Sequence, residues 1–239
     1  MCGKFTQMAS WAEVYDYANL LGANPNDDVK TFTPMRTVPV VHLNEAGDGR
    51  LVTPMAWGFT DRNADPKKRR VRNMHARGET VNSKSTWSDA FRYRRGITWA
   101  KTFNEGEEIM VQFDDGTPAG KTWTRQWVFR PKDDKPIILG VIYDVFDAGN
   151  GPEYEFVQVT TPANPLVMKV TERMPLVLRE EDIELWLGEL PAPVEDVQSL
   201  IRTCDFNEAE WDMFVEDPSK KPPRPRKKQR SEIDKPRLF

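Results

Sequence analysis

The sequence is poor in the residues that build disulfide frameworks and metal sites. Only two cysteines, Cys2 and Cys204, and two histidines occur among 239 residues. Two cysteines make no disulfide framework, which is typical of a protein in the reducing cytoplasm. Two histidines provide few of the ligands that a zinc site needs. We therefore expect no metal site.

Long apolar runs and nucleotide-binding motifs are also missing. No stretch of about 18 apolar residues occurs, and the first residues lack the basic and then apolar pattern of a signal peptide. Neither a GxGxxG sequence nor a P-loop is present, and no segment repeats. We expect a soluble cytoplasmic protein without a membrane segment or a cofactor, and we expect it to be a monomer.

Charge is distributed unevenly along the chain. The net charge is −3 at pH 7, but residues 220–239 contain nine Lys or Arg and two acidic residues, so the tail carries +7 and the rest −10. Four prolines and no aliphatic residue before Ile233 predict that this end is disordered. We expect a domain over residues 1–217 and a tail over 218–239. The tail would contact nucleic-acid phosphates, increase solubility or fold back on the acidic body.

Short apolar or alternating runs predict strands over most of residues 32–177, where Gly, Pro, Asn or Asp separate them. A short helix is predicted among these strands over 86–93. Near the start, Ser10 and Glu13 form a capping box for a helix that ends at Gly22.

Three further helical segments are predicted after residue 179. They cover residues 179–188, 193–204 and 207–215, and the last has Asn207 and Glu210 as its capping box. Together the elements predict an α+β fold with a mainly antiparallel, barrel-like β core and flanking helices.

Cys2 directly follows the initiator methionine. Methionine is usually removed before a small residue, which would leave Cys2 with an α-amine and a thiol on adjacent carbons. The ordinary pKa is ~8 for the amine and ~8.5 for the thiol, so each is partly nucleophilic at neutral pH. Such a 1,2-aminothiol condenses with an aldehyde to an imine and then to a thiazolidine ring. The position alone also fits a small residue without a role at a variable chain end.

Four separated stretches resemble the motifs of one protein family. MCGKFTQ resembles MCGRF, MAWGF resembles MRWGL, HARGETV resembles NARAETV, and TTPAN followed by TERMPLVL resembles TTxAN followed by HDRMPVIL. The spacing from Ala163 to Pro175 matches without a gap, and the resemblance covers roughly residues 2–190. The chain thus resembles the SOS response-associated peptidase family, whose members shield abasic sites in single-stranded DNA.

The resemblance implies a mechanism for Cys2. An abasic deoxyribose opens to an aldehyde, and the α-amine and thiol of Cys2 would close on it as a thiazolidine, a DNA–protein crosslink that protects the strand. Glu105 stands where the family has the glutamate of its FYE sequence, which implies that Glu105 moves protons during imine formation. From the residues alone, Glu105 also fits an exposed loop carboxylate beside Glu107 and Glu108.

Two positions depart from the family's active-site pattern, and we include both among the catalytic candidates. His75 stands where the family has an asparagine, and Thr171 stands where it has a histidine. Three classes of function therefore stay open. The protein is an abasic-site crosslinking enzyme, a single-stranded DNA-binding relative with little chemistry, or an N-terminal-nucleophile peptidase or hydrolase.

A dense positive stretch leads into the HARGETV motif. Phosphates bind such clusters by charge and counterion release, although a solvated charged loop has the same composition. The stretch consists of Lys67, Lys68, Arg69, Arg70, Arg72 and Arg77. The resemblance implies that Thr160 and Arg173 also line the path of the single-stranded DNA. Lys4 stands where the family has an arginine, and a lysine lacks the bidentate fork of a guanidinium group. The predicted DNA-binding residues are Lys4, Arg69, Arg70, Arg72, Asn73, Arg77, Thr160 and Arg173.

Two tryptophans have alternative roles. Trp57 and Trp99 would stack on bases of a single strand or belong to the buried core.

Overall fold

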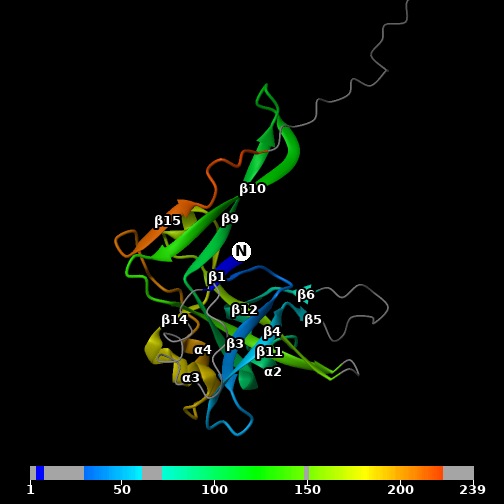
Figure 1. Cartoon of the computed structure of the whole chain (residues 1–239), viewed down its shortest axis with the longest axis vertical. Helices are drawn as coiled ribbons and strands as arrows, with labels where there is room; N and C mark the ends of the chain where they lie inside the picture. The colour runs from blue at the N-terminus through cyan, green and yellow to red at the C-terminus, as the bar shows by residue number, and fades with distance from the viewer. Residues whose placement is uncertain (1–3, 8–29, 61–71, 148–150, 223–239) are drawn as a thin grey trace, which may run out of the picture.

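A computed structural model describes residues 4–7, 30–60, 72–147 and 151–222 (Figure 1). The helix predicted over residues 10–22 and all but the first residues of the 218–239 tail lie outside these ranges, as does Cys2.

Five strands close into a barrel. Neighbouring strands pair in the order β12, β4, β3, β8, β11 and back to β12. The pairs are antiparallel except that of β4 with β12. The five strands are β3 (Thr37–Leu43), β4 (Arg50–Trp57), β8 (Arg95–Ala100), β11 (Ile137–Asp147) and β12 (Pro152–Pro162). The predicted antiparallel, barrel-like α+β fold is confirmed.

A second, antiparallel sheet continues from the barrel, because β8 leads into β9 with a single residue between them. Its strand order is β15, β10, β9, β1, β2. The strands are β1 (Lys4–Gln7), β2 (Lys30–Phe32), β9 (Thr102–Gln112), β10 (Pro118–Pro131) and β15 (Trp211–Val215). The outer parts of β9 and β10 project from the body as a two-stranded arm (Figure 1).

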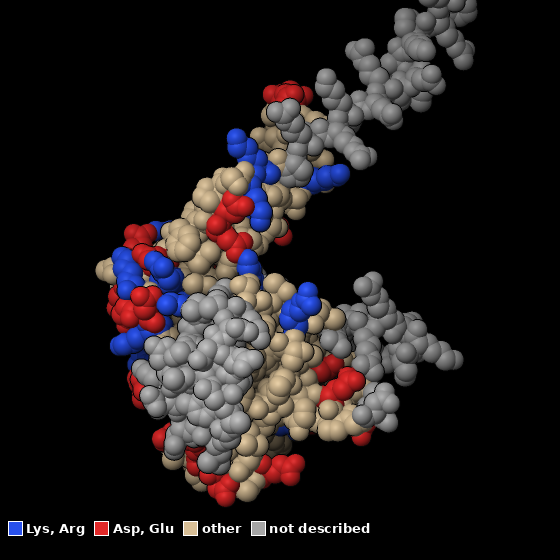
Figure 2. Space-filling model, viewed as in Figure 1, with Lys and Arg blue, Asp and Glu red and all other residues tan. Residues whose placement is uncertain are grey.

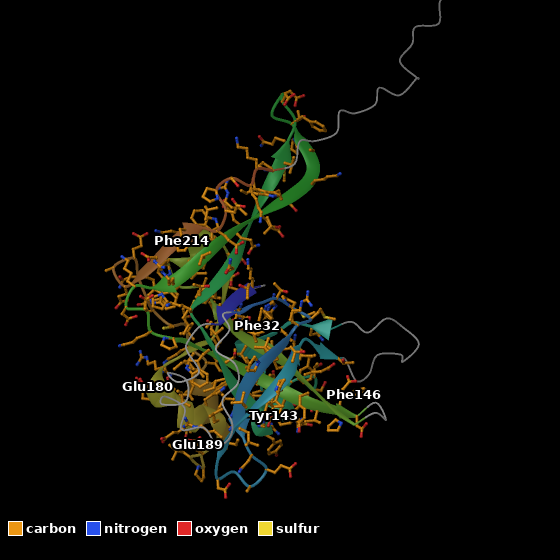
Figure 3. The ribbon with its side chains drawn as sticks, viewed as in Figure 1. Phe32, Tyr143, Phe146, Glu180, Glu189 and Phe214 are labelled. Carbon is orange, nitrogen blue, oxygen red and sulfur yellow. The ribbon has the colours of Figure 1, made fainter. Side chains whose placement is uncertain are left out.

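Two apolar cores hold these layers together. One core joins Phe5 and Phe32 of the second sheet to Trp57 and other residues of the barrel, and Phe32 lies where the two meet (Figure 3). The other core joins Trp99 of the barrel to Trp186 of a flanking helix. Trp57 is 0% exposed and Trp99 1% exposed. Both tryptophans are core residues, so the base-stacking alternative is wrong for this structure.

Short helices cover the second core. The predicted helical segments 86–93, 179–188 and 193–204 all contain helix, in shorter form. These helices are α2 (Ser88–Tyr93), η3 (Glu180–Asp182), α3 (Ile183–Leu187) and α4 (Val194–Ser199). No helix in the described ranges is long and apolar enough to cross a membrane.

The prediction of a helix over residues 207–215 is wrong. The expected capping contacts do form, since the Asn207 N–H donates to Glu210 at 3.3 Å and the Ala209 N–H donates to the Asn207 side chain at 2.8 Å. They close only one turn, after which β15 pairs antiparallel with β10. Pairing along β10 and stacking of the Trp211 ring on Phe206, 3.9 Å between centroids, outweigh the local helix signal.

Small elements lie beside β12, most of them around its end. They are β5 (Phe59–Thr60), β6 (Arg72–Asn73), β7 (His75–Arg77), η1 (Gly78–Thr80), η2 (Val167–Lys169), β13 (Arg173–Pro175) and β14 (Val177–Leu178). All the HARGETV and TERMP motif residues lie in or beside these elements, which places the motifs in one region of the fold.

Candidate functional site

The end of β12 brings three motifs together. Thr160 of the TTPAN motif pairs with Arg77 of β7 in parallel and with Pro175 of β13 in antiparallel register. A strand residue has one neighbour on each edge, so β7 and β13 lie on opposite edges of β12. HARGETV and TERMP thereby flank TTPAN, although 78 residues lie between HARGETV and TTPAN in the sequence.

Arg173 connects these motifs through its guanidinium group. Its Nη2 donates to the Thr160 carbonyl at 2.7 Å and to the Thr160 hydroxyl at 3.1 Å. The same group forms a two-point ion pair with Glu79, in which Nη2 donates to Oε2 at 2.9 Å and Nη1 to Oε1. This hydrogen bonding lowers the pKa of Glu79. Glu79 lies in the HARGETV motif, yet the sequence alone assigns it no role.

Arg77 is exposed beside this network. Its charge adds to the lowering of the pKa of Glu79. The structure therefore brings three predicted DNA-binding residues together, namely Arg77, Thr160 and Arg173. Thr160 is 1% exposed and accepts from Arg173, so its contribution is to hold Arg173 in place.

Asn164 fixes the loop that follows β12. Its side chain, 1% exposed, donates to the carbonyls of Cys204 at 3.0 Å and Phe206 at 3.1 Å, and it accepts from the Val167 N–H at 2.9 Å. Thr171 comes after this loop, where its N–H donates to the Val167 carbonyl at 3.1 Å. The asparagine of TTPAN is thus a structural anchor that positions the chain leading to Thr171 and β13.

His75 contacts an aromatic group at the junction of the barrel and the second sheet, and Glu105 lies on β9, which pairs with β1 next to this group. The Phe5 ring lies 5.2 Å from the Trp57 ring, and the His75 ring meets Trp57 edge-on at 6.2 Å. Phe5 pairs with Phe103, and Glu105 lies two residues further along β9, on the same face. Glu105 is 0% exposed and within a strand. The exposed-loop alternative for Glu105 is therefore wrong.

Lys4 has an internal anionic partner that the sequence did not reveal. Its ammonium forms an ion pair with Glu216, which also accepts from the Asn104 side chain at 3.2 Å. Asn104 is the register partner of Lys4 on β9. Figure 2 shows acidic and basic side chains interspersed over β10 and β15, where Arg130 also pairs with Asp212 at 2.6 Å. The segment after β15 thus neutralises a predicted phosphate ligand.

The dense positive stretch is only partly described. Lys67, Lys68, Arg69 and Arg70 lie outside the described residues. Backbone pairing places Arg72 opposite Thr60 and Asn73 opposite Phe59. Thr60 is held by Glu155, which accepts from its N–H and its hydroxyl, each at 2.7 Å. Arg72 and Asn73, at the end of this stretch, therefore belong to a short β-strand pair that Glu155 anchors.

The described ranges contain no cluster of three or more His, Cys, Asp or Glu that would hold a metal ion. Cys204 is half-buried, and its burial raises the pKa of the thiol. A raised pKa disfavours the thiolate, so Cys204 is a poor nucleophile.

Comparison with known proteins decides the family. The sequence profile of the family described as SOS response associated peptidase (SRAP) matches residues 1–216. The chain belongs to the SRAP family. The abasic site processing protein YoqW of Bacillus subtilis (strain 168) is 23% identical over 214 residues, which cover 88% of this chain and 90% of YoqW. The abasic site processing protein YoaM of the same organism is 22% identical, with 88% and 89% covered.

Solved structures share the fold of this SRAP protein. A protein from Bacteroides thetaiotaomicron superposes with a TM-score of 0.68 at 17% identity, covering 90% of this chain and 91% of that one. A phage-related protein from Bordetella bronchiseptica gives a TM-score of 0.67 at 15% identity, with 90% and 93% covered. At this level of identity the similarity establishes the architecture.

Proposed function

We propose that this SRAP protein captures abasic sites in single-stranded DNA by forming a thiazolidine between Cys2 and the opened sugar. The observation that carries the proposal is the pairing of β1 with β9, in which Lys4 lies opposite Asn104, the residue before Glu105. Cys2 precedes Lys4 by two positions, and consecutive Cα atoms are ~3.8 Å apart. The pairing supports the proposal, because the strand that begins two positions after Cys2 runs beside a strand that carries a buried carboxylate.

The chemistry balances without a cofactor. The α-amine of Cys2 attacks C1′ of the aldehyde, the resulting carbinolamine loses water to give an imine, and the sulfur adds to the same carbon. The thiol proton ends on the ring nitrogen, so one water is released for each crosslink. Glu105 takes the proton from the attacking amine and returns it to the departing hydroxyl, as a general acid–base residue does.

His75 and Thr171 set the rates of ring opening and reversal in this proposal. An imidazole titrates near neutral pH and carries protons, whereas a threonine hydroxyl only donates and accepts hydrogen bonds. The His75 ring contacts Trp57, which belongs to the same core as Phe5 and Phe103, and this position favours His75 as the second proton carrier. Thr171 lies two residues before β13 and has no proton-transfer role.

Single-stranded DNA binds by charge in the proposal. Arg77 and Arg173 hold phosphates beside the end of β12, and the positive stretch before β6 extends the path. Residues 1–217 act as the domain, as a monomer, and the tail over 218–239 adds weak attraction for the strand. Binding is largely independent of base sequence, because phosphate contacts carry no sequence information.

The test uses the purified protein and an oligonucleotide with one abasic aldehyde. We expect a heat-stable band of reduced mobility on a denaturing gel, and an intact mass equal to the protein without Met1 plus the oligonucleotide minus one water. Three controls should give no adduct: Cys2→Ala, a protein with a tag before Cys2, and an oligonucleotide whose aldehyde is reduced with borohydride.

The outcomes separate the alternatives. Crosslinking by the tagged protein at the normal rate would exclude the thiazolidine, because the ring needs a free amine. Binding without an adduct would support the DNA-binding relative, which the replaced residues at positions 75 and 171 favour. Cleavage of a peptide substrate that depends on Cys2 would support the peptidase alternative.

A further inference from the structure

Gln158 is a buried polar residue that the mechanism above does not use. It lies on β12 between Phe156 and Thr160, and it is 0% exposed. Successive strand residues face opposite sides. Val157 and Val159 belong to the core under the helices, whereas Phe156 belongs to the core that includes Phe5 and Trp57. The Gln158 side chain therefore faces the interior of the barrel and its junction with the second sheet.

The Gln158 carboxamide lacks a hydrogen-bond partner in the described part of the chain. Neither Oε1 nor Nε2 is bonded there, and both atoms are inaccessible to solvent. Buried polar groups in folded proteins are nearly always paired, because an unpaired one loses its hydration without compensation. A buried amide without a partner in the protein is suited to form hydrogen bonds with a bound ligand.

His75 is the immediate neighbour of Gln158. The two residues are register partners on the parallel strands β7 and β12, and neighbouring strands lie about 4.8 Å apart. The His75 ring contacts Trp57, which belongs to the same core as Phe156. Gln158 and His75 thus project to the same side, next to Thr160, which is held by Arg173.

We propose that Gln158 is a binding residue of the site, whose carboxamide hydrogen-bonds the hydroxyl set free when the deoxyribose ring of the abasic nucleotide opens. The inference rests on the proposed function and names a sugar-binding group for it. A carboxamide has both a donor and an acceptor, so it matches a hydroxyl, which also has both. The resemblance to the family places an asparagine at position 75, and Gln158 restores an amide beside the histidine found there.

The test compares Gln158→Met with the wild-type protein, because Met has a similar volume and no hydrogen-bonding amide. Noncovalent affinity is measured for two oligonucleotides, one intact and one with a borohydride-reduced abasic site, which retains the open-chain hydroxyl but forms no thiazolidine. We expect the wild type to prefer the reduced site, and Gln158→Met to lose about tenfold of that preference. Crosslinking to the aldehyde should slow in parallel.

A stability measurement separates binding from structure. Removing an unpaired buried amide should leave the urea midpoint of the free protein equal or higher, whereas a structural residue would lower it. The control is Gln112→Met on the exposed part of β9, which should change neither affinity. An unchanged preference in Gln158→Met, or a wild type without any preference, would overturn the inference.

Failure of the proposed function gives a different pattern. A wild type that forms no crosslink, but prefers the reduced site in a manner that depends on Gln158, would refute the thiazolidine mechanism and leave the sugar contact standing. A wild type that crosslinks at the rate of Gln158→Met would support the function and refute the contact.

Discussion

Arg173 and Glu79 form a two-point ion pair that connects β13 to the turn after β7. The same guanidinium group donates to both oxygens of Thr160. One side chain therefore fixes the relative positions of three motifs that are distant in the sequence.

We first predict that Arg173→Lys weakens single-stranded DNA binding severalfold and slows crosslinking, because lysine lacks the planar fork that reaches Glu79 and Thr160 together. Glu79→Gln should cost only about 1 kcal/mol of unfolding free energy, since the Glu79 side chain is 48% exposed. Filter binding and urea unfolding measure the two effects. Normal DNA affinity in Arg173→Lys would show that the fork is dispensable.

A second prediction concerns His42, which is 6% exposed and hydrogen-bonded to the Leu43 carbonyl (2.6 Å) and the Thr53 hydroxyl (2.7 Å). Burial lowers the pKa of His42 from its ordinary value of 6.5. The unfolded chain therefore binds a proton before the folded one does, and stability that is full above pH 6.5 declines as the pH falls towards the lowered pKa.

The measurement is the urea midpoint of the wild type and of His42→Gln between pH 7.5 and pH 5. The variant should be less stable at pH 7.5 and should lose less stability on acidification. Parallel pH profiles for the two proteins would contradict the assignment of this slope to His42.

A third prediction follows from the ion pair of Lys4 with Glu216. Glu216→Gln removes the carboxylate that neutralises Lys4, so affinity for intact single-stranded DNA should rise about two- to threefold, with a steeper dependence on salt. Asp212→Asn, on the same strand region but paired with Arg130, is the matched control. If both variants raise the DNA affinity equally, the cause is the change in net charge and not the release of Lys4 from Glu216.

The fourth prediction addresses the positive stretch and the tail. Changing Arg69, Arg70 and Arg72 together to Gln should lower the slope of log affinity against log salt by up to about 2, at ~0.7 for each lost phosphate contact on a single strand. Deleting residues 218–239 should lower it less. If the salt dependence of DNA affinity is unchanged in both proteins, the DNA-binding face lies elsewhere on the protein.

The fifth prediction concerns the two substituted positions. His75→Ala should slow both formation and reversal of the crosslink, and wild-type rates should change with pH as an imidazole titrates. Thr171→His should accelerate reversal, because it adds a proton carrier. Timed release of the oligonucleotide at several pH values measures both. Wild-type rates in both variants would remove these positions from the chemistry.

The strands and most of the short helices were predictable because local signals control them. Alternation and turn residues located β3 and β11, and the motif spacing located the loop from Ala163 to Pro175. The prediction for segment 207–215 was wrong because its capping residues form a real turn, while pairing with the distant β10 makes the next residues a strand.

Contacts between distant segments also explain which site residues were missed. Nothing in the sequence around Glu216 or Gln158 distinguishes them from ordinary polar residues. Glu216 acquires its role from contact with Lys4, and Gln158 from its register with His75. Glu105 and Arg173 became candidates only because they lie in recognisable motifs.

The contact between Lys4 and Glu216 spans 212 positions of the chain. During synthesis Lys4 leaves the ribosome long before Glu216 is added, because so many residues separate them. The strands that pair with β1, namely β2 and β9, are complete by residue 112, whereas the ion pair of Lys4 with Glu216 forms only after β15 has been made and has joined the sheet. Folding that depends on such distant contacts is slow. A nascent or truncated chain that lacks β15 and Glu216 would present the Lys4 ammonium without the Glu216 carboxylate.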